Sequence, residues 1–127
     1  MEPRTKRLRQ LVDLQARIKA IHEMRHAGHL RDAAVAREEA EALIARAREP
    51  SPVADLFPDL YVRRIGAALA RKDEQVGLAR DEASRIAAQT ARGNIVARAY
   101  DEALRQEERT RSEKETLDAV SSRATRK

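Results

Sequence analysis

Residues 22 to 26 read HEMRH, which fits the H-E-x-x-H pattern of zinc-binding helices in metallopeptidases. Two histidines four apart lie on one face of a helix, so His22 and His26 could bind one zinc ion while Glu23 polarises a bound water. A third ligand is still needed, and the nearest candidate is His29. Seven residues of straight helix rise about 10.5 Å, whereas a zinc to nitrogen bond is about 2.0 to 2.1 Å, so one ion could hardly take all three histidines.

The longer pattern H-E-x-x-H-x-x-G-x-x-H also fails in this chain. It requires glycine at position 29 and histidine at position 32, where the chain has His29 and Asp32. We therefore expect the three histidines to be polar interruptions within or beside a helix contact, with Asp81 as an acceptor for His26. A pH-sensitive contact and a zinc peptidase based on His22 and His26 are the alternatives. No catalytic residue, metal or cofactor is predicted.

The composition predicts long helices instead of a thick globular core. Of 127 residues, 42% are apolar and 37% are charged, but only 2% are aromatic. A chain dominated by Ala, Glu, Arg, Leu and Lys is typical of long helices and coiled coils. Cysteine is absent, which excludes disulfides and thiolate chemistry and is compatible with a reducing cytosol. No apolar run approaches the roughly 20 residues that cross a bilayer, so we expect a soluble, unprocessed, cytoplasmic protein without membrane insertion.

The net charge of +5 raises nucleic acid and acidic protein surfaces as partners. Arg4, Lys6, Arg7 and Arg9 form one basic cluster, but elsewhere acidic and basic residues alternate, as on a solvated helix surface. No aromatic residues stand among the basic ones to stack on bases. We therefore expect protein partners and no nucleic acid.

Three prolines mark the single break in the helical pattern. Pro50, Pro52 and Pro58 lie within nine residues, and a proline inside a helix costs about 3 kcal/mol. We predict one helix over about 4 to 48, a connection at 49 to 57, and a second helix over about 58 to 121. Ser51 or Asp55 could cap a short turn in the connection.

Each predicted helix carries a narrow apolar stripe. Two such stripes joined by a short connection predict an all-α fold in which residues 1 to 127 form a single antiparallel coiled-coil hairpin. The small residues in the stripes predict a close approach of the helices. The stripe of the first helix comprises Leu8, Leu11, Ile18, Ala33, Ala36, Ala40, Ile44 and Ala47, and that of the second comprises Ile65, Leu69, Val76, Ala79, Ala83, Ile86, Ala97, Tyr100 and Leu104.

A turn centred near residue 53 or 54 fixes a register in which residue j faces residue 107 minus j. Leu8 then faces Ala99 and Tyr100. Because the second stripe ends at Leu104, residues 105 to 127 extend as a charged helix beyond the start of the first one. This overhang is either a solvated tail or a docking helix. Phe57 and Tyr61 are expected to close the hairpin by packing on each other or on the first helix, with partner binding as the alternative.

The basic amphipathic start LRQLVDLQARI and the charged end RTRSEKETLDAV resemble those of the FliJ-type proteins of bacterial flagellar and type III export. The resemblance implies a non-enzymatic stalk that inserts the tip formed by both termini into the hexameric export ATPase. It also implies contacts with the export gate and with chaperones, and hence peripheral association with the inner membrane through partners. The implied tip segments are about 4 to 18 and 100 to 121. The implied contact residues are Arg9, Leu11, Tyr100, Leu104, Arg109, Arg111, Lys114 and Leu117.

Other function classes stay open. In a generic coiled-coil scaffold or dimerising adaptor, the stripes would pair between chains instead of within one. The zinc peptidase is a less favoured alternative, because a two-helix hairpin lacks the walled cleft that peptide hydrolysis requires.

Overall fold

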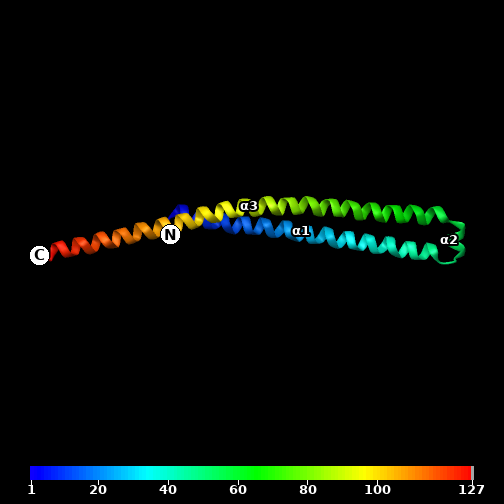
Figure 1. Cartoon of the computed structure of the whole chain (residues 1–127), viewed down its shortest axis with the longest axis horizontal. Coiled ribbons are helices and arrows are strands. Elements are labelled where there is room, and N and C mark those ends of the chain that lie inside the picture. Colours follow the sequence, from blue (N-terminus) through cyan, green and yellow to red (C-terminus); the bar gives the residue numbers. More distant parts are fainter. Residues whose placement is uncertain (127) are drawn as a thin grey trace. The chain divides into compact units, whose positions relative to one another are not determined.

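A computed structural model describes residues 1 to 126 and is helical over nearly all of them. Helix α1 is Pro3–Arg48, α2 is Pro52–Leu56 and α3 is Pro58–Thr125. No strand occurs among residues 1 to 126, and α1 and α3 pack together (Figure 1). The prediction of an all-α fold built from two long helices is therefore confirmed.

Prolines and one capping serine set where the helices end and begin. α1 ends at Arg48, before Pro50, and the Ser51 hydroxyl accepts a hydrogen bond from the backbone N–H of Val53 at 3.3 Å. This bond caps α2, the short helix inside the connection. Pro58 begins α3, where its missing N–H would have had no partner in any case. α3 continues to Thr125, four residues beyond the end predicted from the sequence.

The chain divides into two compact units, each of which contains a part of α1 and a part of α3. We call residues 1 to 19 with 88 to 127 the terminal unit, and residues 20 to 87, which include α2, the turn unit. Each unit is described by itself below. The organisation of the whole chain as one hairpin stays a prediction.

Burial along both helices follows an alternation of three and four residues, which we call the seam. This spacing averages 3.5 residues, the period at which one helix face stays against a partner helix. All seam positions are buried or half-buried. In α1 they are Thr5, Leu8, Val12, Gln15, Lys19, His22, His26, His29, Ala33, Ala36, Ala40 and Leu43, and in α3 they are Tyr61, Ile65, Ala68, Lys72, Gln75, Ala79, Glu82, Ile86, Gln89, Gly93, Val96, Tyr100, Ala103 and Glu107.

The apolar core of the described residues is thin. Its one large buried side chain is Leu43, and the other members are alanines. Polar side chains are buried beside them, so the seam mixes small apolar residues with hydrogen-bonding ones. The buried apolar residues are Ala33, Ala36, Ala40, Leu43, Ala68 and Ala79, and the buried polar residues are Thr5, Glu82 and Gln89.

The apolar stripes predicted from the sequence are partly wrong in their membership. Leu11 is 41% exposed and Leu69 is 39% exposed, and Ala47 and Ala83 are also exposed. Leu11 lies one residue before the seam position Val12, and Leu69 lies one residue after Ala68. The predicted stripes contain only apolar residues apart from Tyr100, so they do not include most of the polar residues that complete the seam.

The observed register also differs from the predicted one. Gln15 contacts Gln89 in the terminal unit, and in the turn unit His22 contacts Glu82 and His29 contacts Gln75. Within the turn unit the partner in α3 therefore falls as the position in α1 rises. The partners of positions 15, 22 and 29 each lie three residues earlier than the rule of 107 minus j requires.

The connection leaves aromatic and aliphatic side chains in solvent. Phe57 is 57% exposed, Leu56 is 72% exposed, and Val53 is 51% exposed. Phe57 therefore does not close this end of the turn unit as expected. Tyr61 is half-buried at a seam position, and Leu43 is buried.

Candidate functional site

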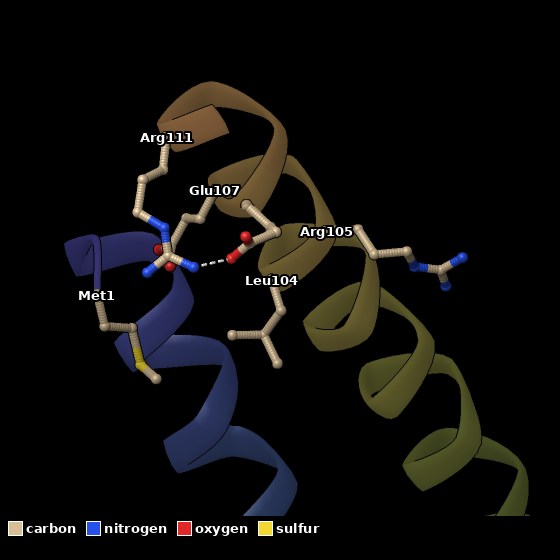
Figure 2. A pocket seen from close by; sticks show the side chains of 6 residues that line it. Met1, Leu104, Arg105, Glu107 and Arg111 are labelled. Atoms are coloured by element: carbon tan, nitrogen blue, oxygen red, sulfur yellow. Dashed lines mark hydrogen bonds and ion pairs between the residues drawn. The ribbon is translucent and has the colours of Figure 1, made fainter. Parts of the chain in front are cut away.

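A groove in the terminal unit brings the first residue of the chain beside residues 104 to 111 of α3. The groove has a volume of about 530 Å³ and is lined by Met1, Leu104, Arg105, Glu107, Glu108 and Arg111. Figure 2 shows the side chain of Leu104 pointing from α3 toward α1, where Met1 lies, whereas the guanidinium of Arg105 extends away from α1. Arg111 forms an ion pair with Glu108 on the rim. The groove thus has an apolar floor and a charged edge.

Glu107 fixes the start of α1 against α3. Its carboxylate accepts a hydrogen bond from the backbone N–H of Glu2 at 2.7 Å. The Thr5 hydroxyl and this backbone N–H hold the pKa of Glu107 below its ordinary value. The Thr5 hydroxyl is itself buried beside this carboxylate.

Beyond Glu107, α3 continues with every side chain exposed. Residues 108 to 126 contain no buried or half-buried position. Leu117 is 68% exposed and Val120 is 58% exposed, three residues apart on one helix face. We call residues 108 to 126, which are the end of α3 and the residue after it, the free segment. Local side-chain bonds occur along it, such as that from the Thr116 hydroxyl to the Ser112 carbonyl at 2.9 Å.

The structure places all eight predicted contact residues in the terminal unit. Tyr100 and Leu104 are half-buried in the seam or beside it, and Arg109 lies 3.6 Å from Glu102 in an exposed ion pair. Only Leu104 and Arg111 line the groove. The others lie along the exposed surfaces of α1 and α3 and are Arg9, Leu11, Lys114 and Leu117.

Polar side chains pair across the seam of the turn unit at the histidines. His22 Nδ1 lies 2.7 Å from Glu82 Oε2, and Arg85 Nη1 lies 2.8 Å from Glu82 Oε1. Burial pushes the pKa of Glu82 upward, but the hydrogen bonds from His22 and Arg85 outweigh it and leave that pKa below its ordinary value. Glu82 is therefore an acceptor at neutral pH, and the Nδ1 of His22 carries the donated proton.

Two further polar pairs join α1 and α3, and their α1 members lie seven residues before and seven residues after His22. His29 Nδ1 lies 2.7 Å from Gln75 Oε1 in the turn unit, and Gln89 bonds the side chain of Gln15 in the terminal unit. Gln15, His22 and His29 are spaced by seven residues in α1, and Gln75, Glu82 and Gln89 are spaced by seven in α3. This heptad spacing of polar residues is the sequence signal that a search for apolar stripes missed.

The histidines do not assemble a metal site in the described part of the chain. No three His, Cys, Asp or Glu side chains among residues 1 to 126 lie together in a way that could hold a metal ion. The acceptors that the structure pairs with histidines are Glu82 and Gln75, whereas Asp81, expected for His26, is exposed.

The comparisons with known proteins gave no match to a protein-family model, to a curated protein or to a solved structure. No helix formed by residues 1 to 126 has the length and apolar character needed to cross a membrane.

Proposed function

We propose that this chain is a non-enzymatic helical adaptor that binds a protein partner through the groove and the free segment of the terminal unit. In this proposal the chain folds as one antiparallel coiled-coil hairpin, and the free segment overhangs the start of α1. The pairing of Glu2 with Glu107, followed by a fully exposed helix, is the observation that carries it. A long helix without a partner face is stabilised when another surface covers its apolar residues.

The partner that we propose is the hexameric ATPase of a flagellar or type III export apparatus, with the export gate and chaperones as further partners. The resemblance of both chain ends to FliJ-type proteins supports this choice. The chemistry of the terminal unit is compatible with it, because a sparse apolar edge of Leu117 and Val120 among charges of both signs suits a reversible protein contact.

The test uses two charge substitutions on the free segment and one matched control. We expect the double variant Leu117→Glu, Val120→Glu to bind the purified export ATPase at least about tenfold more weakly than the unchanged chain. Ile95→Glu is the control, since Ile95 is 66% exposed on α3 of the same unit but lies outside the free segment. Surface-immobilised ATPase with the chain in solution provides the measurement.

Two results would contradict the proposal. If the unchanged chain does not bind the ATPase at micromolar concentration, the assignment to export is wrong. If Ile95→Glu weakens binding as much as the double variant does, the free segment is not the contact. Circular dichroism of each variant shows whether the helices persist.

A further inference from the structure

The two sides of the seam in the turn unit differ sharply in chemistry. On one side, which we call the charged flank, α1 presents Asp32 and Glu39, and α3 presents Arg64 and Arg71. Arg71 Nη2 bonds Glu39 Oε2 at 2.6 Å across this flank. The grooves on this side are lined largely by charged residues.

On the opposite side α1 and α3 together present aliphatic residues. Leu30, Ala33, Ala34 and Val76 line one groove there, together with the charged residues Arg37 and Lys72. Leu30 is 48% exposed, Leu69 is 39% exposed and Val62 is 69% exposed. In α3 these residues repeat every seven positions, which holds them on one side of that helix, and in α1 Leu30 and Ile44 lie fourteen residues apart with Arg37 between them. We call this side the apolar flank and define it by Leu30 and Ile44 of α1 with Val62, Leu69, Val76 and Ala83 of α3.

We infer that the apolar flank of the turn unit binds the same flank of a second copy of the chain. Two oppositely charged residues lie at equal distances from Leu30 along α1, and Arg37 also pairs with Glu41 within one copy. Glu23 stands seven residues before Leu30, and Arg37 stands seven residues after it. A two-fold axis through the level of Leu30 therefore sets Glu23 of one copy against Arg37 of the other, twice.

The same axis matches side-chain sizes. Ala83 and Leu69 stand seven residues on either side of Val76, so the axis opposes the small residue of one copy to the large residue of the other. Leu30 meets its own counterpart at the centre. Opposing large and small side chains lets two surfaces interdigitate without voids.

The contact that this axis allows is small. A two-fold axis at Leu30 overlaps the flanks of the two copies from Glu23 to Arg37, a rise of about 21 Å, and two packed helices are about 20 Å wide, so each copy would contribute about 420 Å². The total of about 840 Å² lies below the roughly 1,200 Å² at which stable interfaces begin, so the expected contact is a reversible one. The thin core, with Leu43 as its one large buried residue, leaves the turn unit with stability to gain from such a contact.

The first test is cross-linking of single-cysteine variants of the full chain, which has no cysteine of its own. Leu30→Cys should form a disulfide-linked dimer under mild oxidation, because the two-fold axis brings residue 30 beside its counterpart. Val35→Cys is the matched control: Val35 is 62% exposed and lines a groove of the charged flank. Equal cross-linking of both variants, or none of Leu30→Cys, would overturn the inference.

The second test is sedimentation velocity of charge variants. Leu30→Glu should weaken dimerisation at least about tenfold, whereas Val35→Glu should leave it unchanged. Arg37→Glu and Glu23→Arg should each weaken it, and the double variant should recover the dimer, because the swap restores both cross-copy pairs. Within one copy, Arg37 pairs with Glu41, and the double variant still lacks this pair because residue 37 is then acidic. A recovered dimer therefore cannot be explained by that pair.

A chain that stays monomeric at about 100 µM would contradict the inference and assign the apolar flank to another occupant, such as a helix of a different protein. A dimer that survives Leu30→Glu would place the interface elsewhere. These outcomes are independent of the Leu117 and Val120 variants, so the proposed ATPase contact can fail while the dimer stands, and the reverse.

Discussion

At the residue scale, His22 of the HEMRH stretch and His29 beyond it take part in pairing the helices of the turn unit. His22 donates to a buried carboxylate that also accepts from Arg85, and His29 faces an amide oxygen. Buried polar groups are tolerated when each finds a partner of matching hydrogen-bond type. Such pairs favour one register over its neighbours, because a slip by one heptad would set the Glu82 carboxylate beside His29 and leave Gln75 without a histidine.

Acidification should weaken the His22 to Glu82 contact through Glu82. Its pKa in the folded state is lowered, so its contribution to stability is fully present above the ordinary glutamate pKa of about 4.3 and is lost as the pH falls through the lowered value. We expect Glu82→Gln to lower the thermal midpoint at pH 7. The difference from the unchanged chain should shrink progressively between about pH 5 and pH 2.

Thermal circular dichroism at several pH values measures this difference. Glu115→Gln is the control, because Glu115 lies exposed in the free segment and its substitution should change the midpoint little. A difference for Glu82→Gln that stays constant or grows in acid would show that the ionised carboxylate does not stabilise the folded state.

At the element scale, α3 is long enough to carry weak helix formers within its span. Gly77 lies in its interior, and a Cβ built at that position meets no atom within 4 Å. Glycine is less favourable than alanine in a helix interior because its backbone loses more freedom on folding.

Gly77→Ala should therefore stabilise the turn unit by about 1 kcal/mol. Chemical denaturation followed by circular dichroism measures the change. The reverse substitution at an exposed helical alanine, Ala91→Gly, should destabilise by a similar amount. A destabilising Gly77→Ala would mean that the outer face of α3 at this position is covered by something the isolated chain does not show.

At the scale of the whole molecule, the small apolar core makes association a determinant of stability. If two copies bind through the apolar flank, folding is coupled to concentration, because the dimer is favoured by mass action. A hundredfold rise in chain concentration should then raise the thermal midpoint of the unchanged chain by about 5 °C. Leu30→Glu should show a midpoint that is independent of concentration, and a flat profile for both chains would argue against a dimer.

The sequence by itself determined the elements. Proline positions and alanine-rich, charge-balanced composition predict where α1 ends and where α3 begins, because both act through the local backbone. The spacing of the histidines likewise predicts, from helix rise alone, that one zinc ion could hardly take His22, His26 and His29 together. These conclusions need no knowledge of which residue faces which.

The membership of the seam was decided only by tertiary structure. Apolarity selected Leu69 and Ala83, but Ala68 and Glu82 are the buried residues, since burial depends on which face the partner helix covers. Gln15 accepts a hydrogen bond from Gln89 of α3, and His22 and His29 lie against Glu82 and Gln75, and the sequence named none of these partners. A polar side chain is stable in a seam only through its partner on the other helix, and a partner sixty residues away is set by packing instead of local sequence.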